Sequence, residues 1–219
     1  MPDIVAAVES PRFVLALRNP VDLVVSYHRT QLLALNDDEA DFERAWARSV
    51  RGDTPATDAL DPKLVDYPLV GRLGQAVERL LTHVSREQVH VVLFDDLRTD
   101  PGGTWAALTG FLGLPAQPQP AFDRLNASTK TYRSAVLRRL THRPPSVLSA
   151  PVNRLRQWSR TTPNRLVAAA KAQMGRAEAA PTVSPAVRAE VADYLASDTT
   201  LLGRLLGRDL TRWVEVGTG

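Results

Sequence analysis

The chain contains no cysteine, which excludes a disulfide framework and any site built on thiolate ligands. Its four histidines, His28, His83, His90 and His142, are scattered without the spacing of metal ligands, so we expect no bound metal. The chain has neither a secretory signal nor a hydrophobic run long enough to span a bilayer. From these absences we expect a cytoplasmic protein.

Strong net charge is also absent. The formal net charge of 219 residues is +3, which is too small to indicate nucleic-acid binding. The hydrophobic fraction of 44% is typical of a globular protein, and the length is sufficient for one domain with a sizeable core. We therefore expect residues 1–219 to form a single domain.

Residues 13–35 predict a strand followed by a helix. Residues 13–17 form a short apolar run without helical period, which predicts a buried strand. Asn19 is a favourable N-cap, and Pro20 suits the first helical position. One face of the helix is expected to pack on the sheet, because apolar residues and one histidine recur at helical spacing: Val21, Val25, His28, Leu32 and Leu35.

Arg18 then lies at the carboxyl end of a strand, where open α/β sheets bind their ligands. Ser26 follows eight residues later, close enough to share a ligand with Arg18. A guanidinium can meet two phosphate oxygens at once, and a hydroxyl adds a further donor. The alternative is that Arg18 faces water and Ser26 is an ordinary helix residue.

Residues 67–114 repeat this pattern as helix, strand and helix. Residues 89–94 predict a second buried strand, and the helix before it implies a crossover and a parallel sheet. Asp100 is expected to cap the next helix, which Gly113 ends. Asp95 and Asp96 close the strand, and we expect them to hold a neighbouring loop rather than to act as acids or bases.

Several of these segments, in this order, resemble the sulfotransferases that use 3′-phosphoadenylyl sulfate (PAPS), in particular the bacterial and Golgi-type enzymes. The resemblance rests on residues 17–22 with Ser26 and Tyr27, on Asp95-Asp96-Leu97, on residues 111–114, and on residues 206–210 with Trp213. It implies that Arg18 and Ser26 bind the 3′-phosphate of PAPS, which would be a co-substrate without a metal. It also implies that Trp213 packs back on the domain.

The fold implied is an α/β domain with a parallel sheet flanked by helices, like the P-loop NTPase class and shortened at its N-terminus. In this family, a loop that binds the 5′-phosphosulfate and the catalytic base both precede the arginine motif. The sequence contains no Gly-rich loop with Lys-Ser/Thr, so we expect that the chain starts internally or has lost this half of the site. The catalytic residue is therefore unassigned.

Residues 124–177 hold 12 Lys or Arg residues and no Asp or Glu. The resemblance implies a basic loop here that closes over the 3′-phosphate, with Lys130 and Arg133 as its candidates. The segment could instead attract an anionic acceptor or lie on an anionic membrane surface. A nucleic-acid groove is less favoured, because no recognition motif accompanies the charge. Residues 181–219 predict C-terminal helices.

The predicted function is transfer of a sulfuryl group from PAPS to a hydroxyl or amine of a small-molecule, glycan or lipid acceptor. Residues 36–66, an acidic and loop-rich segment, are a candidate part of the acceptor pocket, although most of their charges are expected to face solvent. Two other functions stay open. The chain could be a catalytically incomplete sulfotransferase-like binding module, or a peripheral membrane-associated protein that uses the basic segment.

Overall fold

The computed structural model describes residues 7–53, 61–116, 118, 130–132, 175–177 and 183–215. These residues form two compact units. The first unit draws on residues 1–26, 68–123 and 184–219, and the second on residues 27–67 and 124–183. The prediction of a single domain over residues 1–219 stays a prediction.

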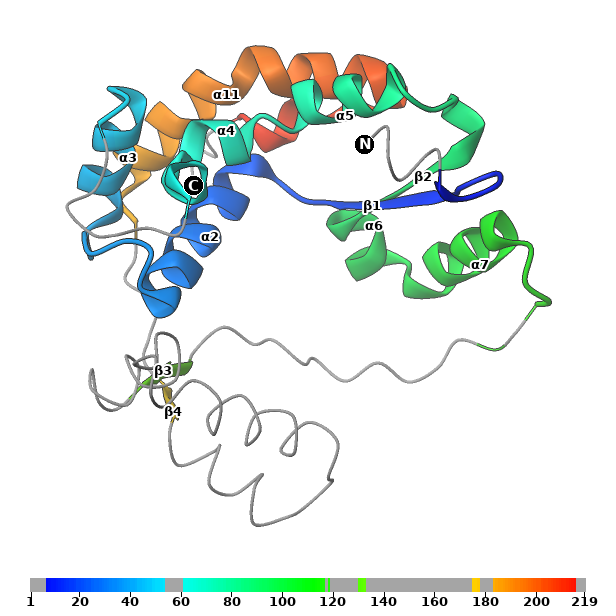
Figure 1. The fold of residues 1–219 in the computed structure, drawn as a ribbon, viewed down its shortest axis with the longest axis horizontal. Helices are drawn as coiled ribbons and strands as arrows, with labels where there is room; N and C mark the ends of the chain where they lie inside the picture. The colour runs from blue at the N-terminus through cyan, green and yellow to red at the C-terminus, as the bar shows by residue number, and fades with distance from the viewer. Residues whose placement is uncertain are drawn as a thin grey trace. The chain divides into compact units, whose positions relative to one another are not determined.

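The first unit contains a parallel pair of strands, β1 (Phe13–Leu17) and β2 (Val89–Leu93), which run side by side (Figure 1). Their register runs from Phe13 opposite Val89 to Leu17 opposite Leu93. A parallel pair requires a crossover, and helices between the two strands supply it. The predicted strands and their parallel pairing are confirmed, and both strands end at the same edge.

The helices of the first unit begin and end at the residue types that favour termini. Asp100 and Ser184 cap two of them through their side chains, and Gly113 and Gly207 end the same two in the left-handed conformation. The elements are the start of α2 (Pro20–Ala34), α4 (Tyr67–Gly71) except for its first residue, α5 (Leu73–Leu81), η2 (Arg86–Gln88), α6 (Phe94–Thr99), α7 (Pro101–Leu112), α11 (Pro185–Leu206) and η3 (Thr211–Trp213).

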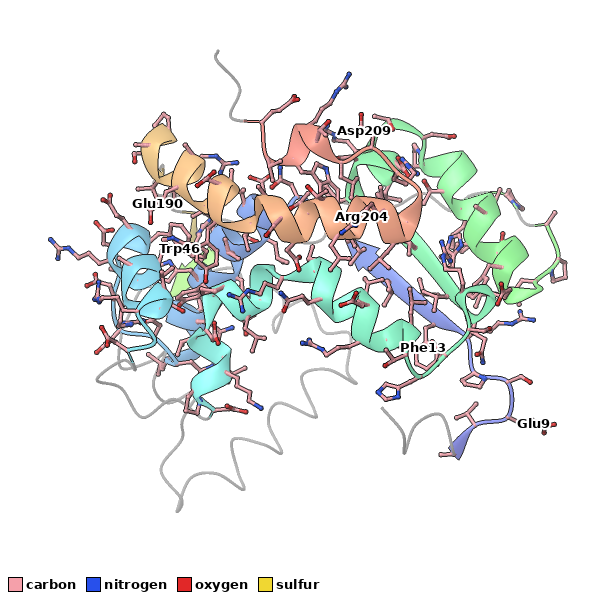
Figure 2. The ribbon with its side chains drawn as sticks, turned by 90° about the horizontal axis from the view of Figure 1, so that it is seen from above. Glu9, Phe13, Trp46, Glu190, Arg204 and Asp209 are labelled. Carbon is pink, nitrogen blue, oxygen red and sulfur yellow. The ribbon has the colours of Figure 1, made fainter. Side chains whose placement is uncertain are left out.

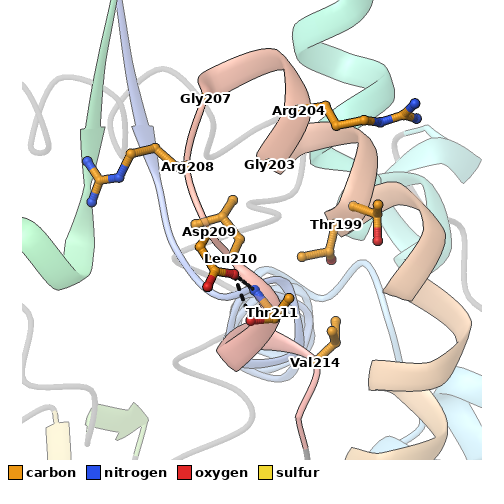
Figure 3. Close-up of a pocket in the computed structure, with 10 residues that line it drawn as sticks. Thr199, Gly203, Arg204, Gly207, Arg208, Asp209, Leu210, Thr211 and Val214 are labelled. Carbon is orange, nitrogen blue, oxygen red and sulfur yellow. Dashed lines mark hydrogen bonds between the residues drawn. The ribbon is translucent and has the colours of Figure 1, made fainter.

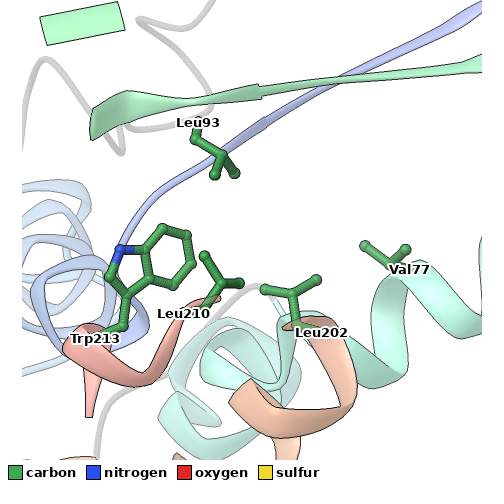
Figure 4. Packing of buried hydrophobic residues seen from close by; sticks show 5 residues of the cluster. All are labelled: Val77, Leu93, Leu202, Leu210 and Trp213. Carbon is green, nitrogen blue, oxygen red and sulfur yellow. The ribbon is translucent and has the colours of Figure 1, made fainter. Parts of the chain in front are cut away.

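The core of the first unit joins its sheet to its C-terminal segment. Leu93 of β2, Val77 of α5 and Leu202 of α11 pack with Leu210 and Trp213 (Figure 4). Complete burial of one such side chain contributes roughly 1.5–3 kcal/mol. Trp213 is 6% exposed, so the expectation that it packs back on the domain is confirmed.

Helices α5 and α11 lie against each other along their lengths (Figure 1). The Asp198 carboxylate of α11 accepts hydrogen bonds from the backbone N–H groups of Gly74 (2.7 Å) and Gln75 (2.9 Å), at the first turn of α5. It therefore caps α5 from another helix. A Cβ atom at position 74 would overlap the backbone oxygen of Asp198, so only glycine allows this approach.

The second unit holds the rest of α2, α3 (Phe42–Val50) and η1 (Pro62–Val65), together with an antiparallel pair, β3 (Lys130–Tyr132) and β4 (Gly175–Ala177). Its core includes Phe42, Ala45 and Trp46 of α3. Figure 2 shows the side chain of Trp46 on α3, where it is 1% exposed. Among the described residues, no helix is both long and apolar enough to cross a bilayer.

Three local predictions were wrong. Strand β1 is not buried: its residues alternate between half-buried and exposed, because one face of this small sheet is covered and the other is open. Val21 and His28 of the predicted face of α2 are buried, but Val24 and Gln31 are buried in place of Val25, Leu32 and Leu35, which are half-buried. Phe94 begins α6 instead of ending the strand, and its side chain is 51% exposed.

Candidate anion site at the strand–helix junction

Arg18 lies where β1 ends and α2 begins. The next residue, Asn19, caps α2: its Oδ1 accepts a hydrogen bond from the Val21 N–H at 2.8 Å. Its Nδ2 donates to the backbone oxygen of Trp213 at 3.0 Å, which ties the junction to the C-terminal segment. Asn19 therefore anchors the backbone beside Arg18 both to α2 and to the C-terminal segment.

The structure brings Arg18 and Ser26 together, as the eight-residue spacing predicts. Nη1 of Arg18 donates to Oγ of Ser26 at 3.4 Å, a long hydrogen bond. Ser26 Oγ itself donates to the backbone oxygen of Leu23 at 3.0 Å, which directs its lone pairs toward the arginine. Both side chains are part-buried. The guanidinium of Arg18 and the hydroxyl of Ser26 thus lie close enough to contact the same ligand.

One donor of Arg18 is without a partner. Its Nε is buried and forms no hydrogen bond, which is costly for a charged group. The guanidinium lies over the Phe94 ring, 5.6 Å from the ring centroid. This contact follows from the register, because Leu17 lies opposite Leu93 and the residues after them share one sheet edge. An anion at this edge could accept from the unsatisfied N–H.

Asp22 is the acid closest to this guanidinium among the ion pairs of the described residues. Its Oδ2 lies 3.9 Å from Nη2 of Arg18, and its Oδ1 lies 2.6 Å from Nη2 of Arg188 on α11. The short pair is a charge-assisted hydrogen bond, whereas the long one is not a hydrogen bond. The three side chains together carry one net positive charge, and they suit a phosphate or another small anion.

Asp95 and Asp96, the two acids after β2, hold a neighbouring segment in place, as expected. Asp95 Oδ2 accepts from the indole N–H of Trp213 at 2.7 Å, and Asp96 forms a two-bond pair with Arg208 at 2.9 and 3.0 Å. The hydrogen bonds that Arg208 donates to the Asp96 carboxylate raise the pKa of Arg208. Both carboxylates hold the C-terminal segment, and the geometry gives neither a substrate-facing role.

The structure says less about Lys130 and Arg133, the two other residues predicted to bind the cofactor. Lys130 opens strand β3 in the second unit, where it lies opposite Ala177. Arg133 lies outside the described residues, as does most of the basic segment. The structure therefore brings together Arg18 and Ser26 of the predicted set, and the roles of Lys130 and Arg133 stay predictions.

A buried polar cluster in the second unit was not predicted. The side chain of Asp37 is 0% exposed, and its Oδ2 accepts from Arg48 at 2.6 Å and from the Tyr67 hydroxyl at 2.5 Å. Burial alone would raise the pKa of Asp37, but the hydrogen bonds from Arg48 and Tyr67 outweigh it and lower the pKa. The expectation that most charges of residues 36–66 face solvent fails for Asp37.

Two neighbours of Asp37 titrate abnormally because they are buried. Desolvation lowers the pKa of His28, whose Nε2 lies 2.8 Å from the backbone oxygen of Glu39. Desolvation, followed by the hydrogen bond to Asp37, raises the pKa of Tyr67. The cluster therefore holds a carboxylate, a neutral imidazole and a protonated phenol at neutral pH. Arg48 and Tyr67 satisfy Asp37, and the Glu39 backbone oxygen pairs with His28, which indicates a structural role.

A cavity of about 440 Å³ lies at the C-terminal end of α11 (Figure 3). Its lining includes Thr199, Arg204, Asp209 and Thr211. Asp209 accepts from both the N–H and the hydroxyl of Thr211, and these bonds lower the pKa of Asp209. Nothing in the sequence pattern singled out this cavity. Within the described residues, no group of three or more His, Asp or Glu side chains could hold a metal ion.

A parallel pair of strands flanked by helices defines an α/β protein, and such proteins bind their ligands at the carboxyl ends of the strands, where Arg18 lies. Residues 6–142 match the family described as the Sulfotransferase domain. The match covers more than half of the chain, which therefore belongs to the sulfotransferase domain family. No curated protein matches the chain.

One similar solved structure is the crystal structure of a sulfotransferase from Alicyclobacillus acidocaldarius. The two share 20% sequence identity and superpose with a TM-score of 0.56. The similarity covers 92% of this chain but 57% of the other, so the chain spans a little over half of that protein's length. The likeness supports the sulfotransferase fold.

Proposed function

We propose that Arg18 and Ser26 bind the 3′-phosphate of PAPS, and that the chain serves sulfuryl transfer from PAPS to a hydroxyl or amine acceptor. The observation that carries the proposal is the convergence of the two side chains at the end of β1, with the Nε of Arg18 buried and unpartnered. A phosphate oxygen is a suitable acceptor for that N–H. Membership of the sulfotransferase family supports this choice of anion.

The described residues suggest how the phosphate would be held. Arg18 would offer Nε and one Nη in its planar fork, and Ser26 would turn its hydroxyl from Leu23 toward the ligand. Phe94 lies under the guanidinium and limits its rotation. Arg18 directly follows β1 and Ser26 lies on α2, so little ordering is needed when the ligand binds.

Bound PAPS supplies the sulfuryl group, and its transfer to the acceptor leaves adenosine 3′,5′-bisphosphate. Arg18 and Ser26 would orient the nucleotide for this in-line step without moving a proton. Lys130 and Arg133 are proposed to add positive charge around the same phosphate. The acceptor is proposed to be a small molecule, a glycan or a lipid, and the reaction is placed in the cytoplasm. No residue is proposed as the catalytic base.

Calorimetric titration with adenosine 3′,5′-bisphosphate tests the proposal. Loss of a charge-assisted contact costs about 1.5–3 kcal/mol, so Arg18→Ala should weaken binding by about 10- to 150-fold. Ser26→Ala should weaken it less, because its contact is neutral. Arg79→Ala removes an exposed arginine of α5 and is the matched control. Equal affinity of wild type and Arg18→Ala would refute the assignment.

Transfer assays with labelled PAPS separate the enzyme from a binding module. Sulfuryl transfer to any hydroxyl or amine acceptor supports the enzyme. Nucleotide binding that depends on Arg18, without transfer to a panel of acceptors, would favour the sulfotransferase-like binding module.

A further inference from the structure

Asp22 lies between two arginines that come from distant parts of the chain. Arg18 lies four residues before it, and Arg188 lies 166 residues after it on the first turns of α11. The side chains of Asp22 and Arg188 are 42% and 40% exposed, so the pair lies at the surface beside the proposed phosphate site. Position alone does not explain why an acid should lie so close to a phosphate-binding arginine.

The two distances show that the Asp22 carboxylate interacts more closely with Arg188 than with Arg18. It is hydrogen-bonded to Arg188 at 2.6 Å but stays 3.9 Å from Arg18. Asp22 is thus hydrogen-bonded to Arg188, and the Nε of Arg18 is left without a hydrogen-bond partner. Without Arg188, the nearest strong donor for Asp22 would be Arg18. The carboxylate would then occupy the guanidinium and repel a phosphate arriving there.

We propose that Arg188 is a positioning residue that holds and neutralises Asp22, and thereby keeps Arg18 available for the phosphate. This inference rests on the proposed function. Arg188 acts on the ligand through Asp22, so its importance depends on the presence of that acid. This dependence distinguishes it from an arginine that contacts the phosphate directly.

A double-mutant cycle tests the inference by titration with adenosine 3′,5′-bisphosphate. Residues in direct contact are energetically coupled, so Arg188→Gln should weaken binding by about tenfold. Asp22→Asn should bind at least as tightly as wild type, because it removes the competing charge. The double variant should bind like Asp22→Asn. Arg204→Gln makes the same charge change at an exposed position of α11 and is the control.

Three results would overturn the inference. The first is wild-type affinity in Arg188→Gln. The second is a double variant as weak as Arg188→Gln, which would indicate direct contact between Arg188 and the phosphate. The third is a tenfold loss in Asp22→Asn, which tests the inference even if the Arg188 variants fold poorly. A wild-type chain that binds no nucleotide would overturn the proposed function together with this inference, a result that differs from all three.

Discussion

Replacing Tyr67 by phenylalanine removes a single hydrogen bond to the buried carboxylate of Asp37. The Tyr67 hydroxyl donates to Asp37 at 2.5 Å, and the exposed fraction of Tyr67 is 0%. The ring contacts with His28 and Phe42, at centroid distances of 5.5 and 6.3 Å, are kept by phenylalanine. The substitution thus removes a donor and almost no packing.

The expected cost follows from the charge of the acceptor. Hydrogen bonds to charged groups contribute about 1.5–3 kcal/mol. Asp37 keeps its bond from Arg48 at 2.6 Å, so it does not become an unpaired buried charge. We therefore expect Tyr67→Phe to lower the free energy of unfolding by about 1.5–3 kcal/mol, at the level of a single strong bond.

Urea denaturation followed by tryptophan fluorescence measures this change. Tyr194→Phe is the control, because the Tyr194 hydroxyl accepts from Arg72 at the surface and should contribute little. The pKa of Asp37 should also rise toward its ordinary value in Tyr67→Phe, so the variant should lose less stability than wild type between neutral and acidic pH. Equal midpoints and equal acid limbs for Tyr67→Phe and wild type would refute this account of the cluster.

Further predictions concern burial elsewhere. The pKa of His28 in the folded chain lies below its ordinary value of 6.5, so wild type should lose stability as the pH falls below 6.5; His28→Gln should remove this slope in urea melts, and His83→Gln should not. Gly74→Ala should lower the melting temperature strongly, because its Cβ overlaps the backbone oxygen of Asp198, and a melting temperature equal to wild type would contradict that packing. Trp213→Ala should cost about 3–5 kcal/mol in denaturant titration, and a loss below 1 kcal/mol would contradict its place in the core.

Local signals predicted the elements that position the site. The short apolar run, the Asn19 cap and the proline after it specify where β1 ends and α2 begins, and the structure follows them. The helix before β2 requires a crossover, which made the parallel pairing predictable. The contact between Arg18 and Ser26 also follows from local geometry, because both residues lie on one strand–helix junction.

Contacts between distant residues were not predictable. Arg188 reaches Asp22 across 166 residues, and Tyr67 reaches Asp37 across 30. No spacing rule connects such pairs, so nothing in the sequence pattern marked Asp37 as an exception among the charges of residues 36–66. Strand burial was overestimated for a related reason: an apolar run indicates a strand, but the layers around it decide how many of its faces are covered.

The measurement that tests the central claim most directly compares two nucleotides on the wild-type chain. Adenosine 3′,5′-bisphosphate and adenosine 5′-monophosphate differ in the 3′-phosphate alone, which is the group assigned to Arg18 and Ser26. The account predicts that the bisphosphate binds tighter by about tenfold or more, and that Arg18→Ala loses most of this difference. Equal affinities of the wild-type chain for the two nucleotides would contradict it.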